Sequence, residues 1–238
     1  MEMLWLFDIR TLIILIPALL FAFYAQYKVR SAYAKYARVA TRRGITAAEA
    51  ATELLARAGV SGVRIESIGR TLGDHYDPRT RTLRLSRPHS PSIADVGVAA
   101  HEAGHAIQHA QRYAPLVLRS AVVPVASLGS QLAFPLFFIG LLFAYMGSQF
   151  GITLLYAGIA LFAGVVLFTL ITLPVEFDAS RRAIQALSRT GLVTREELGA
   201  VKEVLYAAAL TYVAATAMAI AQLLRLLLIA SAVSGRRR

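Results

Sequence analysis

Three long uncharged runs dominate the pattern of hydrophobic and polar positions along the chain. They cover residues 11–27, 121–145 and 152–175. A helix needs about 17–25 mainly apolar residues to cross a bilayer, so each run predicts a transmembrane helix. The second and third runs are separated by a short link at residues 147–151. We therefore expect an antiparallel transmembrane hairpin that returns the chain to the side of the membrane it left.

The last apolar stretch, residues 204–233, is predicted to be helical, but its membrane topology is open. It carries Arg225 and offers small residues for close packing against other helices. Four spans would place the basic tail 236–238 opposite the other basic regions, against the preference of Lys and Arg for the cytoplasm. Charge therefore favours three spans plus a helix that does not cross, with four spans as the alternative.

Residues 28–120 show the mixed periodicity of a small α+β domain. Alternating apolar and polar positions at 63–66 and 82–86 predict strands, and the turn residues 77–80 predict a hairpin. Two helices are predicted by capping boxes, one from Thr46 and Glu49 to Gly59 and one from Ser92 and Asp95 to about Gln111.

The composition excludes an ordinary soluble enzyme. The 238 residues are 57% hydrophobic and only 16% charged, whereas soluble domains average roughly 45–50% and about 25%. The surplus of apolar side chains must face lipid. Because the chain has no cysteine, any metal site must be built from His and carboxylate ligands.

The net charge of +11 is concentrated just after the first apolar run. Six Lys or Arg residues and no acidic residue lie within residues 28–43. This is the positive-inside pattern, and no nucleic-acid-binding motif accompanies it. We therefore expect an uncleaved N-terminal anchor in the plasma membrane, an external N-terminus, the bilayer as a partner, and no nucleic acid. Residues 28–120 and 176–203 are predicted to share the cytoplasmic side.

The strongest chemical motif is His101-Glu102-Ala103-Gly104-His105. On a helix, residues i and i+4 share a face, so both imidazoles can bind one Zn²⁺. Zinc lowers the pKa of a bound water towards neutrality, and Glu102 would act as the general base that takes its proton. The motif predicts one zinc ion with an open fourth position.

The third ligand must come from elsewhere in the chain, and we predict Glu176, where the apolar hairpin ends and a further helix is expected to begin. His109 lies one turn past His105, but three histidines over two turns spread too far for one tetrahedral ion. Asp178 is disfavoured because it projects away from the side of Glu176. The remaining alternative is that Glu176 binds no metal and simply lies at the membrane interface.

The sequence around these residues resembles a known family. The run from Val98 to Gln108 is similar to the active-site helix of the YugP-type neutral zinc metallopeptidases, as are residues 74–78, 176–180 and 208–214. The resemblance covers essentially the whole chain and implies a membrane-bound, gluzincin-like zinc peptidase. The layout also resembles HtpX-like membrane proteases, which carry a supporting aspartate where this chain has Ser180. Asp178 or a hydroxyl would then have to support the zinc-binding histidine.

Two further residues and one strand are candidates for roles in substrate binding and catalysis. Tyr212 and His75 are candidates to donate a hydrogen bond to the tetrahedral oxyanion, with core packing and a turn hydrogen bond as the alternatives. The strand at residues 83–86 is a candidate edge for pairing with an extended peptide substrate. Peptides or membrane proteins are the expected substrates, and the sequence leaves open a homo-oligomer or a membrane scaffold partner.

The sequence thus predicts a mainly α integral membrane protein with a small α+β zincin-like catalytic domain and three or four transmembrane helices. The competing function is a non-catalytic zinc-binding scaffold or adaptor for another protease. The predicted segments are an anchor (1–27), a cytoplasmic α+β domain (28–120), a transmembrane hairpin (121–175), a third-ligand helix and cytoplasmic segment (176–203), and a C-terminal apolar helix with a basic tail (204–238).

Overall fold

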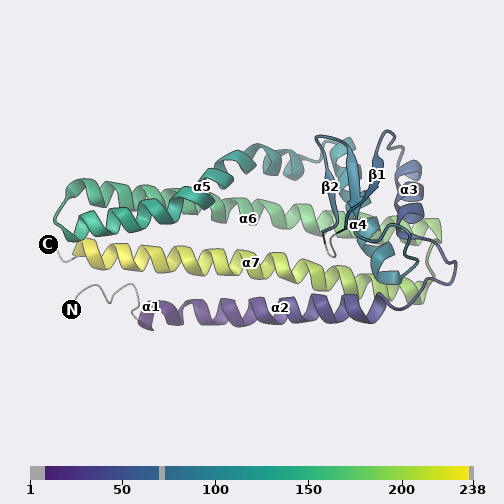
Figure 1. Cartoon of the computed structure of the whole chain (residues 1–238), viewed down its shortest axis with the longest axis horizontal. Helices are drawn as coiled ribbons and strands as arrows, with labels where there is room; N and C mark the ends of the chain where they lie inside the picture. Colours follow the sequence, from purple (N-terminus) through teal and green to yellow (C-terminus); the bar gives the residue numbers. More distant parts are fainter. Residues whose placement is uncertain (1–8, 70–72, 236–238) are drawn as a thin grey trace. The chain divides into compact units, whose positions relative to one another are not determined.

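A computed structural model describes residues 9–69 and 73–235 of the chain, which are mostly helical (Figure 1). The helices are α1 (Ile9–Ile13), α2 (Leu15–Tyr36), α3 (Ala47–Arg57), α4 (Ile93–Ala110), α5 (Ala114–Tyr145), α6 (Gln149–Thr190) and α7 (Arg195–Gly235). The strands are β1 (Arg64–Ser67), β2 (His75–Asp77) and β3 (Thr82–Leu85). The chain divides into two compact units. The polar unit comprises Ala25–Val117 and Leu173–Thr211, and the apolar unit comprises Met1–Tyr24, Leu118–Thr172 and Tyr212–Arg238.

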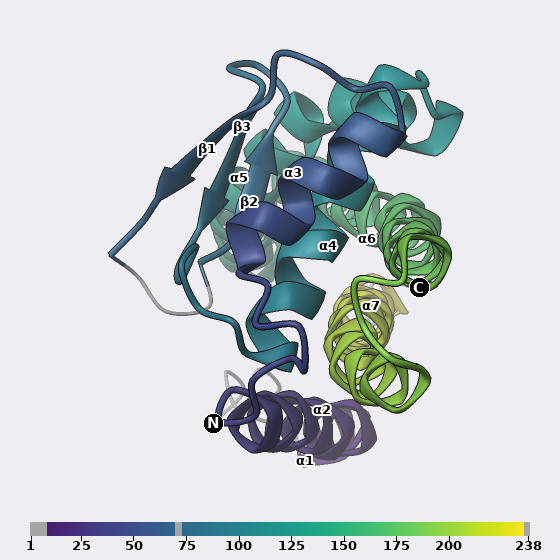
Figure 2. The same cartoon turned by 90° about the vertical axis from the view of Figure 1, so that its right-hand side faces the viewer.

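The polar unit contains a three-stranded sheet in the order β1-β3-β2 (Figure 2). Strand β1 pairs in parallel with β3, so the two predicted strands do not form a hairpin with each other. The turn predicted at residues 77–80 does close an antiparallel hairpin, but its first strand is β2. Helix α4 contacts β2 and β3, and α3 contacts α4. Because β3 is the central strand, both of its edges are already paired. The expectation that residues 83–86 offer a free edge is therefore wrong, and the two edge strands of this sheet are β1 and β2.

Local hydrogen bonds explain where α3 and α4 begin. Thr46 and Glu49 form the predicted capping box, with the Thr46 hydroxyl accepting from the Glu49 N–H and the Glu49 carboxylate accepting from the Thr46 N–H. At α4 only half of the predicted box forms. The Ser92 hydroxyl accepts from the Asp95 N–H, whereas the backbone N–H of Ser92 donates to Ser90. One satisfied helical N–H is enough to fix the start of α4.

The core of the polar unit lies between the sheet, α3, α4 and the parts of α6 and α7 that belong to this unit. Its fully buried large side chains include Leu54, Leu83, Leu85, Val96, Leu187 and Val201. The polar segments before and after the hairpin therefore share one core, although residues 118–172 separate them in sequence. This shared core sets the position of α6 relative to α4.

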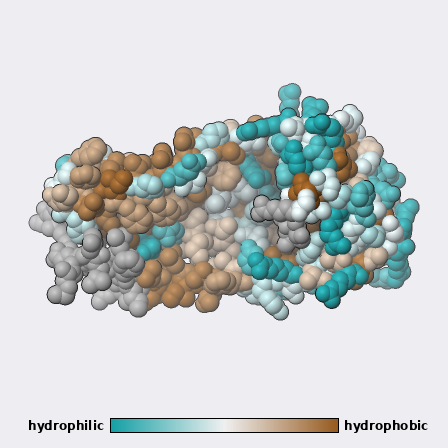
Figure 3. Space-filling model, viewed as in Figure 1, coloured by the Kyte–Doolittle hydropathy of each residue, from teal (hydrophilic) through white to brown (hydrophobic). Residues whose placement is uncertain are grey.

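The apolar unit packs α5, α6 and α7 around a second core that includes Phe137, Leu155 and Leu226. Small residues let helices α5 and α6 approach closely, since a Cβ atom on Gly158 would lie 2.6 Å from the carbonyl oxygen of Ala133. Large apolar side chains also cover its outside, and in Figure 3 the surface of its helices is mainly brown. These exposed side chains include Leu128, Phe138, Leu142, Phe150 and Leu167. A surface of this composition is suited to lipid.

Four described helices are long and apolar enough to cross a membrane, by length and composition: Thr11–Tyr36, Ala114–Tyr145, Gln149–Thr190 and Arg195–Ser234. The last includes the stretch 204–233, so α7 is a candidate fourth span. The basic tail 236–238 lies outside the described residues.

One expectation about α6 is wrong. No new helix begins near Glu176, because α6 runs without a break from Gln149 to Thr190 and contains Pro174. A proline in a helix removes one backbone N–H, and helices of membrane proteins tolerate this loss when neighbouring groups compensate for it. The residues around Glu176 are therefore held within one continuous helix.

Candidate metal centre

Helix α4 carries the two histidines of the predicted motif on a face that packs against α6. The two helices approach closely at Gly104, where a Cβ atom would lie 2.6 Å from the carbonyl oxygen of Ala179. Glu176 lies one turn before Ala179, so this contact brings its carboxylate to the histidines. The glycine inside the motif is therefore required by the close approach of the two helices.

Three potential ligand atoms converge from these helices. The imidazoles of His101 and His105 and the carboxylate of Glu176 form a group whose ligand atoms all lie within 4.8 Å of one another. The carboxylate oxygen Oε2 of Glu176 lies 3.3 Å from Nε2 of His101 and 3.4 Å from Nε2 of His105. The structure thus brings together the three residues that the sequence predicts as zinc ligands.

The donor set and its spacing fit zinc. Tetrahedral Zn²⁺ with bonds of about 2.0–2.1 Å places neighbouring ligand atoms about 3.3–3.4 Å apart. The two nitrogen–oxygen separations agree with that spacing. Two imidazoles and one carboxylate are also a ligand set of catalytic zinc sites, which leave the fourth position for water or substrate.

The remaining ring nitrogens of both histidines have partners. His101 Nδ1 lies 3.0 Å from the hydroxyl of Ser180, and His105 Nδ1 lies 3.0 Å from the amide oxygen of Gln108. Burial alone would lower the pKa of His105. The hydrogen bond to Glu176 and the charges of Glu102 and Glu176 outweigh burial and raise the pKa above its ordinary value of 6.5.

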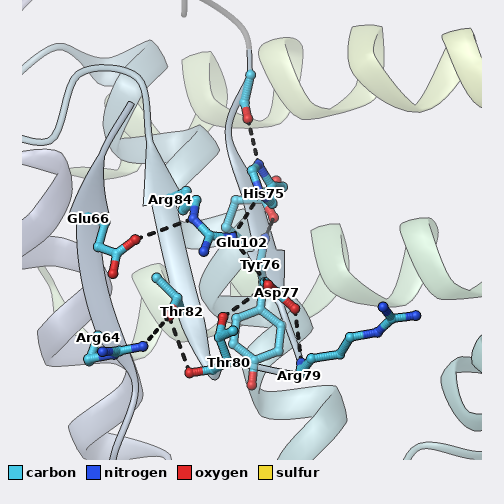
Figure 4. Close-up of polar contacts among 11 residues, drawn as sticks. Arg64, Glu66, His75, Tyr76, Asp77, Arg79, Thr80, Thr82, Arg84 and Glu102 are labelled. Atoms are coloured by element: carbon cyan, nitrogen blue, oxygen red, sulfur yellow. Dashed lines mark hydrogen bonds and ion pairs between the residues drawn. The ribbon is translucent and has the colours of Figure 1, made fainter. Parts of the chain in front are cut away.

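Glu102 is buried next to this group but is not part of it. Its carboxylate oxygen Oε2 accepts a hydrogen bond of 2.9 Å from the backbone N–H of Tyr76 on β2 (Figure 4). The strand thus holds the carboxylate that the sequence predicts as the general base. Sequence reasoning missed this contact, because the pairing of an edge strand with a helix side chain leaves no periodic signal.

The two weaker candidates for the third ligand have other partners. Nδ1 of His109 lies 2.9 Å from the hydroxyl of Tyr76. Asp178 accepts hydrogen bonds from the side chains of Gln108, Arg181 and Arg182. Among the described residues, neither belongs to a group that could hold a metal ion. The hydroxyl of Ser180 lies next to Nδ1 of His101. This contact corresponds to the alternative in which a hydroxyl, and not an aspartate, supports the zinc-binding histidine.

The two candidate oxyanion donors differ in where they lie. His75 is an exposed residue of β2, where Nδ1 lies 2.8 Å from the carbonyl oxygen of Gly73 and Nε2 lies 3.4 Å from the guanidinium of Arg84 (Figure 4). Tyr212 is a residue of α7 at the start of a segment of the apolar unit. Their roles in catalysis remain predictions.

Sequence comparison assigns the class of protein to which this site belongs. The chain belongs to the family described as "Putative neutral zinc metallopeptidase", whose model matches residues 11–231. It is 45% identical over 216 residues to the "Putative membrane protease YugP" of Bacillus subtilis (strain 168), covering 90% of this chain and 93% of that protein. No solved structure matches the chain. The resemblance stated for the motif is thereby confirmed at the level of the family, and a zinc peptidase family implies zinc as the cofactor.

Proposed function

We propose that this protein is a membrane-embedded zinc endopeptidase with one Zn²⁺ held by His101, His105 and Glu176. The observation that carries the proposal is the convergence of these three ligand atoms beside a separate, buried Glu102. The polar unit is then a zincin-like catalytic domain, in which a helix bearing the histidines packs beside a small sheet. Membership of the family and the resemblance to a membrane protease support this interpretation.

The proposed chemistry divides the work between metal and protein. When bound, zinc would polarise the scissile carbonyl and lower the pKa of the attacking water. Glu102 would accept a proton from that water on its carboxylate and deliver it to the leaving amine. The hydrogen bond from the Tyr76 N–H to Oε2 orients the carboxylate and leaves Oε1 for the proton. Burial of Glu102 keeps bulk water from competing for this position.

Two further residues are proposed to act on the substrate. His75 and Tyr212 would donate hydrogen bonds to the oxyanion that develops on the scissile carbonyl. His75 is the first residue of β2, the strand whose Tyr76 N–H contacts Glu102, which favours a place near the substrate. Peptides and membrane proteins are the proposed substrates, because the chain is itself a membrane protein with four candidate spans.

The proposed orientation places the catalytic part in the cytoplasm and the N-terminus outside. One ion cannot be bound from opposite sides of a bilayer, so His101 and Glu176 must share a compartment. The hairpin formed by α5 and α6 returns the chain to the side it left, which satisfies this condition. The six basic residues within 28–43 then select the cytoplasmic side.

The competing function is a zinc-binding membrane scaffold without catalysis. Both functions need the metal ligands, but only the enzyme needs Glu102. The test uses the purified full chain in detergent, loaded with zinc, and a library of unfolded and membrane-derived peptides. Glu102→Gln should abolish cleavage while zinc stays bound at one ion per chain.

Glu66→Gln is the matched control, because Glu66 is an exposed residue of β1 that pairs with Arg84 and does not contact the metal group. This variant should cleave at the wild-type rate. Cleavage by Glu102→Gln at the wild-type rate would contradict the mechanism. Absence of cleavage by every variant, with zinc bound, would favour the scaffold.

A further inference from the structure

A buried glutamine connects one of the candidate zinc ligands to a carboxylate. Gln108 lies one turn after His105 on α4 and is completely buried. Its amide nitrogen lies 2.8 Å from the backbone carbonyl of Val175 and 2.9 Å from Oδ2 of Asp178, both on α6. Its amide oxygen lies 3.0 Å from Nδ1 of His105. The amide nitrogen thus has two hydrogen-bond acceptors and the amide oxygen has one donor, so both polar atoms of the buried amide have partners.

The partners of Gln108 fix the orientation of its amide. A backbone carbonyl can only accept a hydrogen bond, so the side facing Val175 must be the NH₂ group. The second N–H then donates to Asp178, which ion pairs with Arg181 and Arg182 keep in the acceptor-only carboxylate form. Turning the amide over would place its oxygen against two acceptors in a buried site, which is strongly unfavourable.

This orientation in turn determines which nitrogen of His105 can bind metal. The amide oxygen can only accept, so Nδ1 of His105 must carry the proton that forms the hydrogen bond. The lone pair of the neutral ring then lies on Nε2, the nitrogen that faces Glu176. The hydroxyl of Ser180 beside His101 can donate or accept, so it does not impose a tautomer on that ring. The two candidate ligands are therefore supported differently.

We propose that Asp178 and Gln108 form a relay that holds His105 in the tautomer and orientation needed to bind zinc. Gln108 is a positioning residue in this relay, and Asp178 acts through it by polarising the amide. The proposal rests on the proposed function, because it assumes that His105 is a zinc ligand. In many zinc sites a carboxylate contacts the histidine directly and increases its basicity. Here an amide separates the two groups, and the aspartate lies two residues after the third ligand.

A purely structural role is the competing explanation, since Gln108 also ties α4 to α6 through Val175. Thermal stability alone would not separate the two roles. The protonation of the His105 ring separates them, because a tie between helices does not determine which ring nitrogen carries hydrogen.

The first experiment measures zinc affinity of the full chain in detergent by competition with a chelator, using Zn²⁺ alone as the probe. Gln108→Met keeps the length of the side chain but removes the amide, and should weaken zinc binding roughly 10- to 100-fold. Asp178→Asn should weaken it in the same direction by a smaller factor. The control is Gln111→Met, which removes an exposed acceptor for Arg182 without touching His105, and should bind zinc like the wild type.

The outcomes separate this proposal from the proposed function. Failure of the wild type to bind zinc would refute the proposed function itself. Wild-type affinity in Gln108→Met, with the wild type binding zinc, would overturn the relay. Unchanged affinity in Asp178→Asn would remove Asp178 from it.

The second experiment uses the wild-type chain, so its result does not depend on whether a variant at position 108 folds. Nitrogen-15 spectra of the five histidines in the zinc-loaded wild type, with His105 assigned by substitution, should show metal on Nε2 and a slowly exchanging proton on Nδ1. Metal on Nδ1 of His105, or a proton there that exchanges as fast as that of an exposed histidine, would overturn the proposal.

Discussion

The backbones of Gly104 and Ala179 touch where α4 crosses α6. A Cβ atom on Gly104 would lie 2.6 Å from the carbonyl oxygen of Ala179, closer than real Cβ atoms approach any neighbour. One turn of α6 separates Ala179 from Glu176, and Gly104 directly precedes His105 on α4. The same contact that packs the helices therefore sets the distance between two of the proposed zinc ligands.

We predict that Gly104→Ala weakens zinc binding even though no ligand is changed. The methyl group must push α6 away from α4, at a cost of about 1–3 kcal/mol for overpacking, and Glu176 moves with α6. Gly97→Ala is the control on the same helix, because its Cβ atom would meet only the side chain of Val201 at 3.2 Å. Zinc affinity measured by chelator competition should fall for Gly104→Ala and stay unchanged for Gly97→Ala. Equal affinities of both variants and the wild type would show that α6 adjusts freely.

We predict that Glu176→Gln loses zinc, whereas His109→Ala retains it. The glutamine keeps the size of the side chain but removes the charge that faces both imidazoles at 3.3–3.4 Å. Removing a ligand should weaken zinc binding by more than the roughly 10- to 100-fold expected when a residue that supports a ligand is removed. Metal analysis of the purified variants provides the measurement. Loss of zinc from His109→Ala would assign the third ligand to His109 instead.

The contact between β2 and Glu102 predicts a variant that impairs cleavage without loss of metal. Tyr76→Pro removes the N–H that holds the carboxylate, and proline is tolerated on edge strands such as β2. The hydrogen bond to a charged group is worth about 1.5–3 kcal/mol, so kcat should fall roughly 10- to 100-fold. Tyr76→Ala also loses the ring and its contact with His109 but keeps the N–H, so it serves as the control. Similar rates for the two variants would exclude a role for the N–H.

The free energy of unfolding should depend on pH through the Asp77 carboxyl in the hairpin turn. The pKa of the Asp77 carboxyl lies below its ordinary value of 3.8, because the Arg79 N–H and the Thr80 hydroxyl donate to it and Arg84 lies nearby. A depressed pKa in the folded state means that the stabilisation is present above about pH 3.8 and is lost as the pH falls through the folded value.

We therefore predict that Asp77→Asn lowers the Tm at neutral pH by at most a few degrees, because the side chain is partly exposed and solvent screens its charge. Asparagine can still accept from the Arg79 N–H, so the variant removes mainly the charge. The difference in Tm between variant and wild type should vanish as the pH is lowered past the folded pKa. A difference that is independent of pH would mean that the charge is not its cause.

The proposed topology can be tested because the chain has no cysteine. Single cysteines at Ser148, Arg79 and Ser188 would be probed on intact cells with a thiol reagent that does not cross membranes. All three positions are at least partly exposed, so burial does not decide the result. We expect labelling at 148 only, with labelling of all three after the cells are opened. Labelling at 79 and 188 but not at 148 on intact cells would place the catalytic part outside.

The sequence by itself determined the features that depend on neighbours along the chain. Capping residues at Thr46 and Ser92 fixed the starts of α3 and α4, and the turn at Asp77 fixed the hairpin, because these signals act within a few residues. The spacing of His101 and His105 placed two imidazoles on one helix face for the same reason. Long uncharged runs identified the candidate spans through length and composition alone.

Only the tertiary structure decided what depends on contacts across the chain. The order β1-β3-β2 places β3 in the centre, which periodicity cannot reveal because a central strand and an edge strand can share one pattern. The predicted helix start near Pro174 was wrong, since contacts in a packed bundle outweigh the local cost of a proline. The partners of the metal group, Gln108 beside His105 and the Tyr76 N–H beside Glu102, arise where α4 meets α6 and β2. Gln108 and His105 are neighbours on α4, but the hydrogen bonds of Gln108 to Val175 and Asp178 and of the Tyr76 N–H to Glu102 join residues far apart in sequence, and only the packing of α4 against α6 and β2 brings these within reach.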